Sequence, residues 1–169
     1  MNIRKSLLVC AVSCFICSAN ALSIAFQIVQ HEDAKSDPRI SSYQVENGLF
    51  DFFFNKGIIV SNSPVLVSND SGQQKLVLNE SMIEAGEGGV NYFIEIVCEY
   101  DVTESTNPDA ALLENFKRVT WKVVDLKNDR IIGSGENFPP DAKKYKNAEK
   151  GVKDFAYGIA SDVYKIIGR

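Results

Sequence analysis

Residues 91–102, with the sequence NYFIEIVCEYDV, constrain the fold of this chain more than any other segment. Apolar side chains occupy every second position, at Tyr92, Ile94, Ile96, Cys98 and Tyr100. Acidic side chains lie at alternate positions, at Glu95, Glu99 and Asp101. Because side chains alternate between the two faces of a strand, this period predicts a β-strand with one mostly buried face. Such a strand requires a sheet and a layer that covers it.

The chain before this strand begins with a second strand pattern and a helix pattern. Residues 22–32 carry β-branched and aromatic side chains on period two, which predicts a strand. Residues 41–44, SSYQ, have the composition of a capping box, in which a serine hydroxyl and a glutamine bind the free amides of a starting helix. The predicted helix ends at Gly57, because glycine readily takes the left-handed conformation that follows a helix.

A further strand and helix are predicted between Gly57 and Gly89. Residues 57–67 predict a short strand, and Pro64 confines its second half to an edge or a bend because proline cannot donate to the ladder. Residues 71–89 fit either a helix or a strand followed by a helical turn, and the helix is preferred because glycines end it cleanly. Leu76 and Ile83 are expected to face inward.

The last third of the chain predicts a hairpin and a covering helix. Residues 116–126 and 130–136 are strand-like and flank 127–129, which have hairpin-turn composition. The final helix has apolar side chains at three- and four-residue steps, at Val152, Phe155, Ala156, Ile159, Ala160, Val163 and Ile167. The order of elements predicts an α+β (mixed α/β) fold: a single domain with a mixed, mostly antiparallel sheet, helices packed on it and a C-terminal amphipathic helix.

The first residues have the three-part pattern of a secretory signal. Arg4 and Lys5 precede an apolar run from Leu7 to Cys17, and small residues lead to a cut after Ala21. We therefore expect a signal peptide at 1–21, a single globular domain at 22–169, and a periplasmic or envelope-associated location. The alternatives are a retained membrane anchor and a lipoprotein with Cys14 lipidated.

Cleavage at this position changes the cysteine content and the charge. It removes every cysteine except Cys98, so the mature chain must rely on its core and not on an internal disulfide. The full chain carries a formal net charge of −4, and loss of the two basic residues in the signal makes it more acidic. A net negative charge argues against nucleic-acid binding, which depends on clustered lysine and arginine.

Catalytic residues are scarce. His31 is the single histidine, so a Cys98–His31 pair would need their strands to be neighbours, and an apolar strand face is a poor place to lower a thiol pKa. Glu95 and Glu99 are about 13 Å apart along a strand, too far for paired glycosidase carboxylates. The glycine-rich segments match neither a P-loop nor a dinucleotide fingerprint. No enzyme activity, metal or cofactor is expected.

One stripe on the final helix is the candidate partner-binding surface. It lies opposite the apolar stripe and consists of Lys146, Lys150, Lys153, Tyr157 and Tyr164. A basic and aromatic stripe on an acidic protein fits an anionic partner or lipid headgroups, whereas the alternative is a solvated helix face with tyrosines at its edge.

The order of elements resembles the small α/β domain of bacterial envelope accessory proteins. The resemblance rests on a starting strand, a helix ending in glycine before a strand (FFFNKGIIVSN), a later strand (NYFIEIVCEY) and a hairpin (WKVVDLKNDRIIGSGE). It covers the curli-secretion-pore family, lipoprotein activators of penicillin-binding proteins and the amino-terminal domain of the Tol translocation protein. The chain differs from the first two groups because it lacks a convincing lipidation box. The resemblance implies a scaffold or regulator without catalytic residues.

Three functions follow from these observations. The first is an exported, non-enzymatic envelope module that binds a protein partner through a strand edge or the final helix, with peripheral contact to a membrane. The second is a small-molecule or lipid carrier with an aromatic pocket. Its lining would be Phe50, Phe52, Phe53, Phe54, Trp121 and Phe155. The third is an unrecognised hydrolase.

Overall fold

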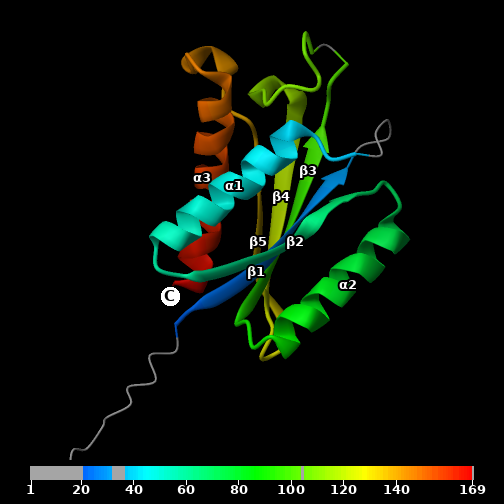
Figure 1. The fold of residues 1–169 in the computed structure, drawn as a ribbon, viewed down its shortest axis with the longest axis vertical. Helices are drawn as coiled ribbons and strands as arrows, with labels where there is room; N and C mark the ends of the chain where they lie inside the picture. Colours follow the sequence, from blue (N-terminus) through cyan, green and yellow to red (C-terminus); the bar gives the residue numbers. More distant parts are fainter. Residues whose placement is uncertain (1–20, 32–36, 104, 169) are drawn as a thin grey trace, which may run out of the picture.

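Five strands and three long helices form the fold in the computed structural model, which describes residues 21–31, 37–103 and 105–168 (Figure 1). The strands are β1 (Ser23–His31), β2 (Ile59–Val67), β3 (Tyr92–Tyr100), β4 (Phe116–Asp125) and β5 (Arg130–Asn137). The helices are α1 (Ile40–Asn55), α2 (Ser71–Glu87) and α3 (Ala148–Ile167), with short 3₁₀ turns at Leu113–Asn115 and Ala142–Lys144. The predictions of an export signal and of Cys14 lipidation fall on residues 1–20, outside the described residues.

The strands form one mixed sheet in the order β2-β1-β3-β4-β5. Strand β1 lies between β2 and β3 and pairs parallel with both. Strand β4 pairs antiparallel with β3 and β5, and the β4–β5 pair is the predicted hairpin. The α+β class is therefore confirmed, with the pairings divided evenly between parallel and antiparallel.

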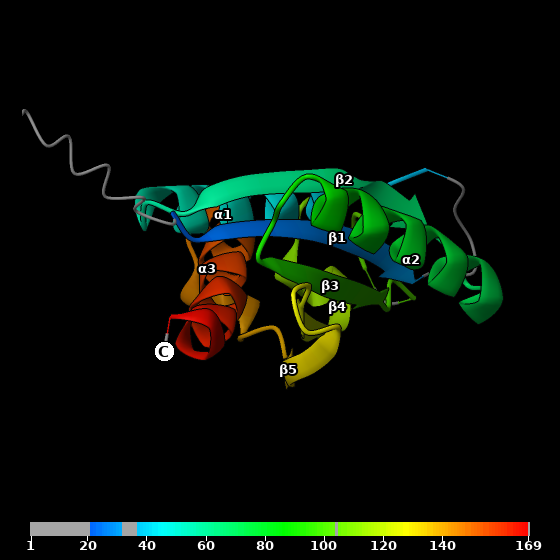
Figure 2. The ribbon, with the colours of Figure 1, turned by 90° about the horizontal axis from the view of Figure 1, so that it is seen from below.

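The helices cover the two faces of the sheet unequally. Helices α1 and α3 pack against each other on one face, and α2 lies alone on the other (Figure 2). The larger core lies under α1 and α3 and includes Phe26, Phe53 and Ile159, all fully buried. The smaller core lies under α2 and includes Val29, Leu78 and Phe93. Strand β1 is buried on both faces, as its apolar character indicated.

Several predicted details are confirmed. Gly57 has φ +74°, the left-handed conformation expected after α1. Strand β2 is an edge strand, and its pairing with β1 is irregular around Pro64, whose carbonyl accepts a hydrogen bond from Gln27 Nε2 at 3.0 Å. The seven apolar positions predicted to form the inner face of the last helix are all buried.

The predicted capping box is wrong. Helix α1 begins at Ile40 after Arg39, and no side chain caps its first turn. Ser41 and Ser42 are buried inside the helix, and their hydroxyls donate to the carbonyl of Ala110 and to Gln30 Oε1. These serines therefore join α1 to the rest of the protein instead of starting the helix.

The predicted orientation of α2 is also wrong. The helix itself is present, but Leu76 is 69% exposed and Ile83 is 53% exposed. The helix packs on the sheet through Leu78, Met82 and Ala85 instead. Because apolar residues occur on both sides of this helix, the sequence alone did not identify the side that the sheet would cover.

Candidate functional site

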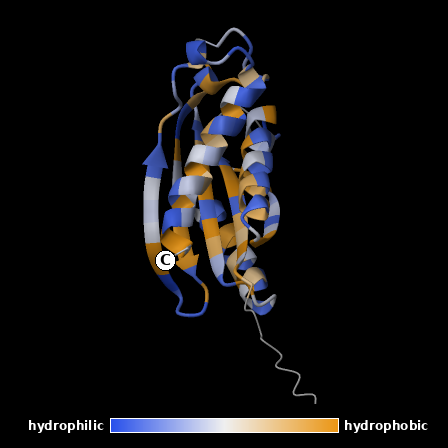
Figure 3. Cartoon of the chain, turned by 90° about the vertical axis from the view of Figure 1, so that its left-hand side faces the viewer, coloured by the Kyte–Doolittle hydropathy of each residue, from blue (hydrophilic) through white to orange (hydrophobic). Residues whose placement is uncertain are grey.

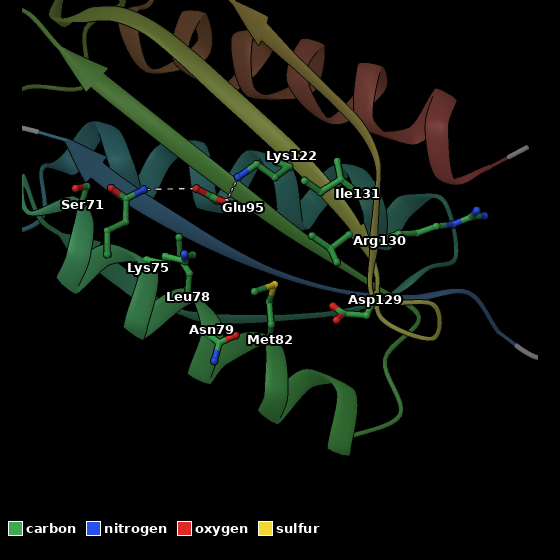
Figure 4. Close-up of a pocket in the computed structure, with 12 residues that line it drawn as sticks. Ser71, Lys75, Leu78, Asn79, Met82, Glu95, Lys122, Asp129, Arg130 and Ile131 are labelled. Atoms are coloured by element: carbon green, nitrogen blue, oxygen red, sulfur yellow. Dashed lines mark hydrogen bonds and ion pairs between the residues drawn. The ribbon is translucent and has the colours of Figure 1, made fainter.

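The incomplete cover over the sheet leaves a cleft between α2 and strands β4 and β5 (Figure 4). It has a volume of about 420 Å³. Its floor is apolar and is formed by the buried side chains of Leu78 and Val124 together with Met82. A helix that packed beside α2 on this face would fill it.

A polar cluster closes one end of the cleft. Lys122 Nζ lies 2.8 Å from Glu95 Oε2, and Gln74 Nε2 donates to Glu95 Oε1 over 3.4 Å (Figure 4). These three residues come from β4, β3 and α2, so the cluster connects the helix to both strands. The Glu95 carboxylate thus has a charged and a neutral partner.

One exposed apolar side chain lines the cleft, and two more lie on the outer side of its α2 wall. Ile131 of β5 lines it and is 61% exposed. Leu76 and Ile83 lie on the outer side of α2, which forms the opposite wall. Arg130 points away from the cleft in Figure 4. Large exposed apolar residues beside one hollow are typical of an interaction surface.

The predicted basic and aromatic stripe of α3 lies beside α1. Lys146 and Lys150 are exposed. Lys153 Nζ binds Asp51 Oδ2 at 2.6 Å, and Tyr157 and Tyr164 pack edge-on against Phe52, with ring centroids 5.8 and 6.1 Å away. Part of the stripe therefore holds the two helices together, and its role in partner binding stays a prediction.

Helix α1 also exposes aromatic rings. Phe54 is 67% exposed and stacks on Phe50, with ring centroids 6.4 Å apart. Tyr43, two turns earlier on the same side of the helix, is 45% exposed. These rings face away from the core, and the repeated phenylalanines at 52–54 gave no indication of which would be exposed.

The six aromatic residues predicted to line a carrier pocket do not lie together. Phe53 and Phe155 are buried in the larger core, and Trp121 donates from Nε1 to Asn137 Oδ1 at 2.9 Å. Phe50 and Phe54 lie at the surface. This set therefore does not form one cavity.

The Cys98–His31 pair is also excluded as a catalytic unit. Cys98 pairs with Gln30 across neighbouring strands, and both side chains point into the face covered by α1 and α3. His31 follows Gln30, so its side chain points to the opposite face, where it is exposed. Burial raises the pKa of the Cys98 thiol to about 12, so it is protonated at neutral pH.

We therefore expect Cys98 to resist alkylation in the native protein at pH 8 and to react fully in denaturant, because burial removes both access and thiolate. The measurement is mass spectrometry after iodoacetamide treatment. Ser134→Cys, at an exposed position of β5, is the positive control. Native labelling of Cys98 at the rate of the Ser134→Cys thiol would contradict the prediction.

The carboxylates of β3 have basic partners on the next strand. Glu99 Oε1 lies 2.6 Å from Arg118 Nη2, and Glu95 pairs with Lys122 as described above. Among the described residues no group of three or more histidine, cysteine, aspartate or glutamate side chains is arranged to hold a metal ion. None of the helices in the described ranges is long and apolar enough to cross a membrane.

These features define a class of protein: a small α+β domain with a half-covered mixed sheet and two surfaces rich in exposed apolar side chains. Residues 23–168 match the model of a protein family described as "Uncharacterised protein", and the chain belongs to that family. No curated protein matches the chain.

The chain is similar to several solved structures of bacterial proteins. The chain is similar to the PelC dodecamer from Paraburkholderia phytofirmans, with 12% identity, 88% of this chain and 89% of that chain covered, and a TM-score of 0.46. TolB from Acinetobacter baumannii is 12% identical, with 86% of this chain but 28% of that chain covered and a TM-score of 0.45.

The C-terminal domain of LpoB from Salmonella enterica is also 12% identical, with 69% and 82% covered and a TM-score of 0.39. TolB and the LpoB domain are thus among the solved structures to which the chain is similar. At these identities the likenesses concern the fold alone.

Proposed function

We propose that this protein is an exported, non-enzymatic module of the bacterial cell envelope that binds a partner protein in the cleft between α2 and β4–β5. The observation that supports the proposal best is the exposed apolar side chain of Ile131 beside an apolar floor formed by Leu78, Met82 and Val124. The signal pattern at 1–21 supports export. The buried, protonated Cys98 supports a role without thiol chemistry.

The partner element that fits the cleft best is an amphipathic helix. The lining residues of α2 run from Ser71 to Met82, a length of about 17 Å or three helical turns. A helix placed there would complete the layer on this face of the sheet and bury Met82 and Ile131. Its apolar stripe would meet the floor, as in other helix-in-groove complexes.

Site-specific photo-crosslinking in intact cells tests the proposal. A photoreactive residue at Ile131 should give one discrete adduct, because this side chain lines the cleft and is exposed. Adding Met82→Glu should reduce the adduct at least about tenfold, since it places a charge against the apolar surface of the helix. Mass spectrometry then identifies the partner and the segment that is linked.

A matched control is available on strand β2. Ile59 is 60% exposed, almost equal to Ile131, but does not line the cleft. A photoreactive residue there should not give the same adduct, and Ile59→Glu should leave the Ile131 adduct unchanged. Absence of an Ile131 adduct, or the same adduct from both positions, would overturn the cleft as the binding site.

A further inference from the structure

The outer side of α1 carries a narrow row of apolar side chains that the fold leaves uncovered. The row consists of exposed residues at steps of three and four along the helix, and we call it the α1 seam: Ile40, Tyr43, Asn47, Phe50 and Phe54. Its four apolar and aromatic members are between 37% and 67% exposed. Figure 3 looks onto the layer formed by α1 and α3, and no further element of the described chain lies over this layer.

The seam lies on the side of α1 where a polar surface is normally found. The opposite side of the helix packs into the larger core through the fully buried Val45, Leu49 and Phe53. A helix at the surface of a globular protein usually turns polar side chains to the solvent. Helix α1 is instead apolar on both sides. A contiguous exposed apolar surface of this kind marks an interaction site.

The spacing of the seam is the spacing found where two helices pack together. Steps of three, four, three and four residues repeat the a and d positions of a heptad, which lie along one narrow line on a helix. Side chains in such a line insert between those of a facing helix. The seam extends over about 21 Å from Ile40 to Phe54. The element that fits it is therefore another α-helix.

The centre of the seam favours a second copy of this chain as the source of that helix. Asn47 is the one amide in the seam and lies midway between Ile40 and Phe54. An asparagine amide both donates and accepts hydrogen bonds, so it can pair with the same amide of an identical helix. A polar asparagine at one a position fixes the alignment of two helices in this way. The apolar ends of the seam then meet apolar ends.

The charges beside the seam allow two acidic chains to approach each other. The full chain has a net charge of −4, so two copies repel unless their contact is neutral. The seam contains no charged side chain. Next to it, Asp51 Oδ2 is bound by Lys153 Nζ at 2.6 Å. On the other flank, Glu46 Oε1 accepts a hydrogen bond from Asn62 of β2 at 2.6 Å, so this carboxylate is held toward the sheet edge.

We propose that the α1 seam is the contact of a homodimer, in which α1 packs on α1 of a second copy about a two-fold axis at Asn47. The contact is isologous, because the same patch serves both chains. It is about 21 Å long and one helix wide, so it buries less than the roughly 800 Å² per partner of a standard interface. The dimer therefore exchanges with the monomer at micromolar concentrations. The α2 cleft lies on the other face of the sheet and stays open.

Sedimentation velocity of the exported protein, purified after natural processing, tests for the dimer across the micromolar range. We expect the dimer fraction to rise with concentration. Phe50→Ser with Phe54→Ser should raise the dissociation constant at least about tenfold, because two exposed rings are removed from the contact. The matched control, Leu76→Ser with Ile83→Ser at 69% and 53% exposure on α2, should leave it unchanged. A monomer at every concentration, or an equal loss in the control, would overturn the proposal.

Charge substitutions at Asn47 test the two-fold axis directly. Asn47 is exposed in the single chain, so Asn47→Asp and Asn47→Lys should both keep the fold, as circular dichroism can verify. Each variant alone should be monomeric, since like charges meet across the axis. An equal mixture of the two should form a dimer, because opposite charges then meet. Single variants that remain dimeric, or a mixture that remains monomeric, would show that the axis does not lie at Asn47.

The homodimer and the cleft can be tested independently of each other. Asn47→Asp should leave the Ile131 adduct in cells unchanged, because Asn47 and the cleft belong to opposite faces of the sheet. Met82→Glu should leave the dissociation constant of the dimer unchanged for the same reason. A dimer that depends on Met82 and not on Asn47 would place the contact in the cleft and overturn the α1 seam.

Discussion

Gly48→Leu is expected to lower the free energy of unfolding by about 3 kcal/mol, because α1 and α3 cross at this glycine. A Cβ added at Gly48 would lie 2.6 Å from the Cβ of Ala156 and 3.4 Å from the carbonyl oxygen of Lys153. The helices would have to separate, which would disturb the larger core and weaken the Lys153–Asp51 pair. Urea unfolding followed by circular dichroism measures the change.

The controls for this prediction are two glycines in helices with free space around them. A Cβ at Gly158 of α3 or Gly86 of α2 meets no atom within 4 Å. Gly158→Ala and Gly86→Ala should therefore stabilise the protein by about 0.5 to 1 kcal/mol, since alanine favours the helix more than glycine does. If the Gly48→Leu variant unfolds at the same urea concentration as these variants, the prediction that α1 and α3 have no room for a side chain at Gly48 is wrong.

Gln30→Leu is expected to cost about 3 kcal/mol, because it leaves buried polar groups without their partner. Gln30 is fully buried, and its Oε1 accepts from the Arg39 backbone amide at 2.7 Å and from Ser42 Oγ at 3.0 Å. Ser42 Oγ also lies 2.8 Å from Tyr100 Oη. The amide side chain thus joins β1, the start of α1 and the end of β3.

Gln27→Leu provides the comparison on the same strand. Gln27 is also buried, but its Oε1 has no hydrogen-bond partner among the described residues. Its replacement should cost about 1 kcal/mol or less, because only the bond from Nε2 to the Pro64 carbonyl is lost. An equal loss of unfolding free energy for the two variants in thermal or urea unfolding would contradict the prediction that the Gln30 hydrogen bonds stabilise the protein more than the Gln27 hydrogen bond does.

Elements with a single strong period were predictable from the sequence. Strand β3 and helix α3 carry their apolar side chains on one clear face, and the turn at 127–129 separates two obvious strands. Helix α2 has apolar residues on both sides, so its existence was predictable and its orientation was not. The serines at the start of α1 match a local capping signal, but distant partners bind their hydroxyls.

The candidate sites were harder to predict than the elements. The lysine and tyrosine stripe of α3 was visible as a helical pattern, but Phe52 of α1 occupies part of it. The cleft was not visible at all, because its walls come from α2, β4 and β5. These three elements are far apart in the sequence. They meet because α2 connects β2 to β3 across one face of the sheet, and β4 and β5 follow β3 in the sheet order.

The sequence by itself determined the class of fold and the identity of most elements, because periodicity and composition are local properties. The tertiary structure decided which apolar residues stay exposed, which glycine lies at a helix crossing and where the sheet is left uncovered. These depend on contacts between segments far apart in the chain, such as Gly48 with Ala156, and no local pattern encodes them.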